Sequence, residues 1–182
     1  MAVTREQVAQ LYVATFNRAP LSDGLDYWTS SDFTIEQIAT SFFDQPEAQA
    51  IYTDDGEPIS SEEFVLRIYD NLFNRLPLAA GLEYWTDALD NGTVSPAQMI
   101  LAVANGATDP DDVAILANRT EAGMYYADQG GENTEFSLAD VDETAASLET
   151  VKAEMDADIA GSMEDSFTAS TDDLVGGAGN DV

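Results

Sequence analysis

The sequence predicts an all-α protein, a multi-helix domain built from two homologous helical repeats plus further C-terminal helices. Apolar residues recur along most of the chain at the three- and four-residue spacing of a helix face. Strand-type alternation bounded by hairpin turns is absent from residues 1–160. One stretch of the sequence is duplicated: residues 11–28 and 68–85 are identical at ten of 18 positions. Duplicated helical units usually pack against each other, so we expect a shared core.

The helices are predicted from apolar stripes and from capping signals. Each repeat opens with an amphipathic helix, whose stripe is Val8, Leu11, Tyr12 and Phe16 in the first repeat, and Val65, Ile68, Tyr69, Leu72 and Phe73 in the second. Capping boxes, in which a Ser or Thr precedes Gln or Glu by three residues, mark helix starts. They begin at Thr4, Thr34, Ser60 and Ser95. Proline at positions 96 and 110 suits the first helical position.

The duplicated stretch contains the motif Asn-Arg-x-Pro-x-x-x-Gly-Leu-x-Tyr-Trp. We name residues 17–28 and 74–85 the first and the second motif copy. Proline cannot continue a helix, so it fixes a corner after the first helix of each repeat. The arginine lies where that helix ends, near its exposed carbonyl groups. The structural residues of the copies are Asn17, Arg18, Pro20, Gly24 and Trp28, and Asn74, Arg75, Pro77, Gly81 and Trp85.

The arginine of each copy needs a partner. In the first copy we expect Arg18 to bond Asp23. Ala80 occupies the corresponding position in the second copy, so the partner of Arg75 has to be a different acid or a carbonyl. The glycine of each copy permits close approach of a neighbouring helix.

Each motif copy ends in an adjacent Tyr-Trp pair, which offers a large area for burial. We favour core packing for these aromatic residues, because a framework is copied whereas sites usually diverge. The alternative is that they stack on sugar rings. Adjacent residues of a helix point about 100° apart, so at most one of each pair can face a given groove. The candidate ligand-binding residues are Tyr27, Tyr84, Tyr125 and Tyr126.

Composition divides the chain into five segments. Residues 107–182 hold 19 acidic and two basic residues, and Gly130-Gly131 interrupts two apolar stripes in this half. The segments are a first helical repeat at 1–59, a second at 60–106, an acidic helical extension packed on the repeats at 107–161, a polar aperiodic linker at 162–171, and a C-terminal segment of different character at 172–182.

Two copies of this motif resemble the domain-of-unknown-function 4214 family. The resemblance covers about residues 5–160, and residues 113–128 resemble the segment that often follows these repeats. It implies an all-helical fold similar to phycobilisome linker domains. It also implies a context in bacterial surface and secreted proteins, with little direct chemistry.

The sequence Gly-Gly-Ala-Gly-Asn-Asp at 176–181 matches the first six places of the nonapeptide of calcium-binding parallel β-rolls. Glycines allow the tight turn and aspartate supplies a hard oxygen for Ca²⁺, so Gly177, Gly179 and Asp181 are metal-site candidates in an incomplete turn. One turn cannot form a site, and a flexible tail is the alternative. The segment 172–182 resembles the first turn of a truncated RTX array.

The resemblance to RTX proteins implies a longer protein with this chain as its N-terminal module. We expect that protein to be a surface-layer protein or an adhesin. RTX proteins commonly leave the cell by type I secretion with a C-terminal signal, which fits the absence of an N-terminal signal peptide. The first residues have no basic region followed by an apolar run, which agrees with this expectation. We therefore expect a location outside the cell, at its surface, and Ca²⁺ as cofactor.

Charge and composition exclude several functions. The net charge of −29, from 35 acidic and six basic residues, repels nucleic acid. The charge indicates either solubility in a salty medium or surroundings rich in divalent cations. The chain has no histidine and no cysteine, so nucleophilic triads and zinc sites are not expected and we predict no enzymatic activity. No stretch approaches 18 consecutive apolar residues, so we expect no transmembrane segment.

Two functions remain. The first is a non-enzymatic cell-surface anchoring module that binds lipopolysaccharide O-antigen or another surface polysaccharide. Its groove is expected between the two repeats or along the acidic second half, with calcium bridging an anionic polysaccharide to the acidic surface. The alternative is a self-association or linker module that joins neighbouring subunits of a surface lattice without binding glycan.

Overall fold

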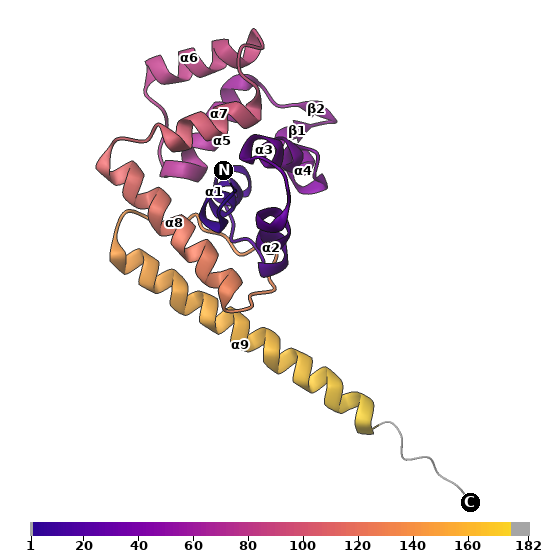
Figure 1. Ribbon diagram of the computed structural model, residues 1–182. Helices are drawn as coiled ribbons and strands as arrows, with labels where there is room; N and C mark the ends of the chain where they lie inside the picture. The colour runs from indigo at the N-terminus through magenta and orange to yellow at the C-terminus, as the bar shows by residue number, and fades with distance from the viewer. Residues whose placement is uncertain (1, 176–182) are drawn as a thin grey trace, which may run out of the picture.

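The structure is a computed structural model that describes residues 2–175, with side chains through residue 163. It is mostly helical, which confirms the all-α prediction (Figure 1). The elements are α1 (Arg5–Phe16), α2 (Ser22–Ser30), α3 (Ile35–Phe43), α4 (Pro46–Tyr52), β1 (Thr53–Asp54), β2 (Glu57–Pro58), α5 (Ser61–Phe73), α6 (Ala79–Asp90), α7 (Pro96–Asn105), α8 (Pro110–Asp128) and α9 (Ala145–Val175). The β-roll turn, with Gly177, Gly179 and Asp181, lies outside the described residues.

Helix starts follow the capping signals of the sequence. Complete capping boxes begin at Thr4, Thr34 and Ser95. The side chain of each capping residue accepts a hydrogen bond from the amide of a glutamine three residues later, and the side chain of that glutamine accepts one from the amide of the capping residue. At Ser60 only half of the predicted capping box forms, since the Ser60 side chain accepts from the Glu63 amide without a return bond from the Glu63 side chain. These caps satisfy amides that the first helical turn leaves without partners.

The core is centred on α1, which contacts α2, α3, α4, α5, α7 and α8 (Figure 1). Its apolar stripe is buried apart from the half-buried Phe16, and the corresponding stripe of α5 is buried apart from the half-buried Tyr69. A second apolar cluster joins α8 and α9 to the start of the chain through Val13, Tyr126, Leu138 and Met155. The acidic C-terminal half therefore packs against α1 as well as against itself.

One small hairpin departs from the expectation that residues 1–160 contain no strands. Thr53 pairs with Pro58 and Asp54 with Glu57 in an antiparallel ladder. The turn residues Asp55 and Gly56 have φ values of 48° and 86°, as a tight two-residue hairpin turn requires. Two residues per strand are too few to show alternation, so the sequence pattern missed it.

The segment 162–171 also departs from its expectation as an aperiodic linker, because it continues the backbone of α9. No glycine or proline stands between Ser162 and Val175, so nothing in the sequence ends the helix there. The last part of α9 extends away from the bundle in Figure 1. A helix without an apolar stripe gives no periodic signal, which explains the error.

Among residues 2–175, no helix combines the length and the apolar character needed to cross a membrane.

Candidate functional site

The arginine of each motif copy forms a two-point ion pair with a carboxylate at the start of a later helix. The Nε and one terminal nitrogen of Arg18 donate to the two carboxylate oxygens of Glu47, both at 2.6 Å. Arg75 donates to Asp112 in the same manner, at 2.7 and 2.6 Å. Paired N–H···O bonds of this kind fix geometry as well as charge. Each arginine thus fastens the corner after one helix to the first turn of another.

The expectation that Arg18 bonds Asp23 is wrong, because the corner turns its side chain towards the N-terminus of α4. In both copies the acid follows a proline that opens a helix, where the positive end of the helix dipole favours a carboxylate. The remaining terminal nitrogen of Arg75 donates to the Leu76 carbonyl at 3.0 Å, so Arg75 has both an acid and a carbonyl as partners.

Aromatic rings lie beneath both arginines. The Arg18 guanidinium carbon is 5.2 Å from the ring centroid of Tyr12 and 5.3 Å from that of Phe16. The corresponding distances from Arg75 to Tyr69 and Phe73 are 5.6 and 5.7 Å. Cation–π contacts of this length add to the ion pairs. The hydrogen bonds to Asp112 raise the pKa of Arg75 above its ordinary value.

The asparagine of each copy ends the first helix in a left-handed conformation. Asn17 has φ 50° and Asn74 has φ 53°, and their amides donate to the carbonyls of Val13 and Asp70. Asparagine adopts this conformation more readily than other residues with a side chain, apart from aspartate. The two corners therefore begin from the same backbone geometry.

The glycine of the first copy makes room for a tyrosine. A Cβ added at Gly24 would lie 2.6 Å from the Tyr12 hydroxyl oxygen, closer than any ordinary contact. At Gly81 the corresponding distance to the Tyr69 hydroxyl is 3.7 Å, which is ordinary van der Waals contact. The same glycine is thus sterically required in one copy only.

Gly24→Ala is expected to destabilise the protein by about 1–3 kcal/mol, because Tyr12 is packed against Phe16 and Phe42 and must move. Gly81→Ala is the matched control and is expected to be neutral or stabilising by up to about 1 kcal/mol, because alanine favours a helix. Urea unfolding of both variants measures the difference. Equal losses would contradict the assignment of Gly24 to the Tyr12 contact.

The Tyr-Trp pairs divide their two rings between core and solvent. Trp28 and Trp85 are half-buried and pack against the core. Tyr27 and Tyr84 are 60% and 62% exposed. The ring centroids of each pair are 4.8 and 4.9 Å apart, edge to face, so each exposed tyrosine rests on its tryptophan. The tryptophans belong to the framework, and the tyrosines face outwards.

Tyr27 lies in a shallow depression on α2 whose other lining residues are acidic or hydroxylated. They are Asp23, Asp26, Thr29 and Ser30. Asp26 also pairs with Arg5, which bonds Asp128 as well. An aromatic ring beside carboxylates and hydroxyl groups is the combination that a sugar needs for stacking and for hydrogen bonds.

Tyr126 has no exposed ring on which a sugar could stack, contrary to the expectation for this residue. It is fully buried, and its hydroxyl donates to Asp158 at 2.5 Å and accepts from the Asn133 amide at 3.0 Å. Burial and the Asp158 hydrogen bond raise the pKa of Tyr126 to about 12. Its position on α8 faces α9, so it joins the second apolar cluster.

Tyr125 is half-buried and already engaged. Its hydroxyl donates to Asp156 at 2.7 Å, and the ammonium group of Lys152 lies 5.4 Å from its ring centroid. The Asp156 hydrogen bond raises the pKa of Tyr125. Of the four candidate tyrosines, only Tyr27 and Tyr84 therefore present largely exposed rings.

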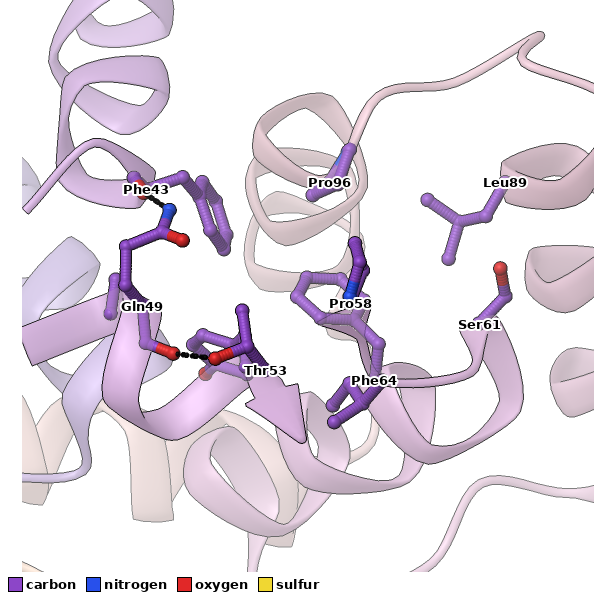
Figure 2. Close-up of a pocket in the computed structure, with 11 residues that line it drawn as sticks. Phe43, Gln49, Thr53, Pro58, Ser61, Phe64, Leu89 and Pro96 are labelled. Carbon is purple, nitrogen blue, oxygen red and sulfur yellow. Dashed lines mark hydrogen bonds between the residues drawn. The ribbon is translucent and has the colours of Figure 1, made fainter. Parts of the chain in front are cut away.

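A cavity of about 310 Å³ lies where a groove between the predicted repeats was expected (Figure 2). It is enclosed by α4 and the hairpin on one side and by the ends of α5, α6 and α7 on the other. Gln49 donates to the Phe43 carbonyl and Thr53 to the Gln49 carbonyl, so both polar groups are engaged. The lining is mainly apolar and holds no carboxylate, so it does not suit a sugar. The lining residues are Phe43, Ala48, Gln49, Tyr52, Thr53, Pro58, Ile59, Ser61, Phe64, Leu89 and Pro96.

Arg119 is a structural residue that the sequence did not reveal. It is fully buried in α8 and donates to four backbone carbonyls, those of Val141, Ala139, Asp70 and Asn71. Two of these carbonyls are in the last turn of α5, where a cation is favourable. Burial lowers the pKa of Arg119. The residue thus ties α5, α8 and the loop before α9 together.

The six basic residues of the chain are all engaged within the protein. Arg119 bonds carbonyls, and the other five form ion pairs with a total of seven of the 35 acids. Most acidic side chains therefore have no basic partner among the described residues. No group of three or more acidic residues in that part of the chain is arranged to hold a metal ion.

These observations define a helical module whose duplicated motif builds two fastened corners and exposes one tyrosine beside each. Residues 39–108, fewer than half of the chain, match the family model described as Domain of unknown function (DUF4214), so this part of the chain is similar to that family. The match begins in α3, ends before α8 and contains the second motif copy, while the first copy precedes it. No curated protein and no solved structure matches the chain.

Proposed function

We propose that the chain is a non-catalytic anchoring module that binds surface polysaccharide, with lipopolysaccharide O-antigen as the preferred ligand. In this proposal it consists of two related helical repeats, 1–59 and 60–106, followed by an acidic helical extension. In this proposal the module belongs to a secreted, calcium-dependent RTX-type surface-layer protein or adhesin at the outside of the cell.

The observation that carries the proposal is that each motif copy exposes a tyrosine whose ring packs against the neighbouring tryptophan. Tyr27 and Tyr84 are about equally exposed and rest on their tryptophans at nearly the same distance. A rigid exposed aromatic ring loses little conformational freedom when it stacks on a sugar ring. Both copies keep this exposed ring although core packing does not require it.

The placement of the two tyrosines favours a polymer over a small sugar. Helices α2 and α6, which carry them, lie at separate places on the bundle in Figure 1. One long glycan with repeating units can contact both, and linked contacts strengthen each other through effective concentration. A monosaccharide reaches only one.

The charge of the surface sets the role of calcium. An acidic surface repels an anionic glycan, and a divalent cation shared between carboxylates of the two partners removes that repulsion. In this proposal Asp23 and Asp26, next to Tyr27, are the carboxylates that share calcium with the glycan. Neutral O-antigen would bind without this bridge.

Retention of the purified chain on immobilised smooth lipopolysaccharide tests the proposal. We expect retention on smooth lipopolysaccharide and none on the rough form of the same strain, which lacks O-antigen. For an anionic O-antigen, millimolar calcium should be required and a chelator should release the protein. If neither form retains the chain while its mass rises with concentration, the chain is a self-association module and the proposal is wrong.

A further inference from the structure

The corner of the first motif copy is covered by another part of the same chain. The Ala19 amide donates to the Phe136 carbonyl at 2.9 Å, and the Leu138 amide donates to the Asn17 carbonyl at 3.1 Å. These two bonds form a single antiparallel bridge centred on Arg18 and Ser137. The segment 136–138 thus lies along the corner as a short added strand.

This cover buries the apolar side chains on both sides of the bridge. Ala19 and Leu138 are both fully buried, and Pro20 and Leu138 both lie against Gly123. In the first corner, residues 17–21, Ala19 and Pro20 are therefore buried, and the other three residues are half-buried. Its backbone donor and acceptor are both satisfied, as buried groups must be.

Within residues 2–175, no segment covers the corner of the second motif copy, although its motif is the same. Leu76 and Leu78 correspond to Ala19 and Leu21, and they are 68% and 79% exposed. Among the described residues, no hydrogen bond reaches the Asn74 carbonyl or the Leu76 amide, the groups that correspond to the bridge partners. The second corner, residues 74–78, thus offers an acceptor, a donor and two leucines to solvent.

The second corner is preformed for a bridge. Asn17 and Asn74 share the left-handed conformation, and each arginine holds its corner through a two-point ion pair. Beside Leu78 lies a hollow of about 330 Å³ lined in part by Tyr69, Trp85 and Val103. An incoming apolar side chain can enter this hollow while the backbone groups pair.

We propose that the second corner docks an extended segment of a partner protein, in the manner in which the first corner holds residues 136–138. The segment carries a large apolar residue, a small polar residue and an aliphatic residue in succession, like Phe136-Ser137-Leu138. Main-chain bonds supply affinity and the alternate side chains supply specificity. This site uses neither of the proposed glycan-binding tyrosines, although Trp85, which lines the hollow, also supports Tyr84.

Charge decides the kind of partner. Each copy of this chain carries a net charge of −29, so a second copy is repelled. Asp109 lines the same hollow and adds to the negative potential near Arg75. The docked segment is therefore flanked by basic residues, which are attracted to this surface.

A synthetic peptide with the sequence of residues 133–141, in which Glu135 and Asp140 are replaced by lysine, probes the site in the intact chain. We expect amide chemical shifts to change at Leu76 and Leu78, and hydrogen exchange of the Leu76 amide to slow. Leu78→Asp should weaken binding by about tenfold, because an exposed leucine loses its apolar contact. Met163→Asp, an equal charge change at a 64% exposed residue of α9, should change affinity by less than about twofold.

Four outcomes overturn the proposal. A scrambled peptide of the same composition binds equally well, or Leu78→Asp binds the peptide as wild type does, or no binding occurs. A dimer of the chain that Leu78→Asp abolishes would assign the surface to a second copy and would also overturn it. We expect smooth lipopolysaccharide to retain Leu78→Asp as it retains the wild type. This measurement distinguishes a failure of the docking proposal from a failure of the glycan proposal.

Discussion

Arg119→Met is expected to lower the free energy of unfolding by about 3–5 kcal/mol, a large part of the stability of a small protein. The side chain is fully buried and donates to four backbone carbonyls. Hydrogen bonds from a charged donor contribute about 1.5–3 kcal/mol each, and unsatisfied buried carbonyls carry a penalty. The variant no longer has to bury a charged guanidinium group, but the desolvation free energy regained in this way offsets only part of the loss.

Urea unfolding of Arg119→Met measures the effect, with Arg5→Met as the control. Arg5 pairs with Asp26 and Asp128, whose side chains are 64% and 60% exposed, so its removal should change stability by less than about 1 kcal/mol. Similar losses in the two variants would show that Arg119 does not hold α5 and α8 together.

Arg75→Met should destabilise by about 3–5 kcal/mol, because it leaves the carboxylate of Asp112 buried without a partner. Only 5% of Asp112 is exposed. Arg18→Met removes the matching ion pair of the first copy, but the Glu47 side chain is 39% exposed and can be hydrated. The loss there should be about 1 kcal/mol.

The double variant Arg75→Met/Asp112→Leu isolates the origin of this loss. Replacing both members of a buried ion pair by apolar residues is often neutral, so the double variant should recover most of the stability. If it is as unstable as Arg75→Met alone, the unpaired carboxylate is not the cause. If Arg18→Met lowers the free energy of unfolding more than Arg75→Met does, the burial of the acidic partner does not determine which ion pair contributes more to stability.

The helical framework was predictable because its signals are local. Thr4, Thr34 and Ser95 sit three residues before glutamines, and the structure has complete capping boxes at all three. The apolar stripes of α1 and α5 likewise repeat within a few residues. The hairpin at 53–58 was missed because its strands are too short to carry a pattern.

The arginine partners were harder to predict because they depend on the tertiary path of the chain. Glu47 is 29 residues from Arg18, and Asp112 is 37 residues from Arg75. A local signal does exist, since both acids closely follow a proline that opens a helix. The burial of Arg119 has no such signal, because its partners are backbone carbonyls.

The exposure of the candidate tyrosines could not be predicted from residue type alone, because it depends on the direction in which each side chain leaves its helix. Tyr125 and Tyr126 are neighbours in sequence, and the hydroxyl group of each donates to an aspartate of α9. Tyr126 is nevertheless fully buried, whereas Tyr125 is half-buried. The direction of a side chain about the helix depends on which neighbour covers it. Only the packing of α8 against α9 determines that, and no single pattern in the sequence encodes it.

The central claim is that each motif copy assigns its tryptophan to the framework and its tyrosine to the ligand. Tyr27→Ala/Tyr84→Ala tests it most directly, when its retention on smooth lipopolysaccharide and its unfolding free energy are measured on the same preparation. We predict more than about a hundredfold weaker retention, from the loss of two linked contacts, with less than about 2 kcal/mol lost in stability. Tyr27→Phe/Tyr84→Phe should keep most of the binding, because the rings remain. Undiminished retention of the alanine variant, with its fold intact, would contradict the claim.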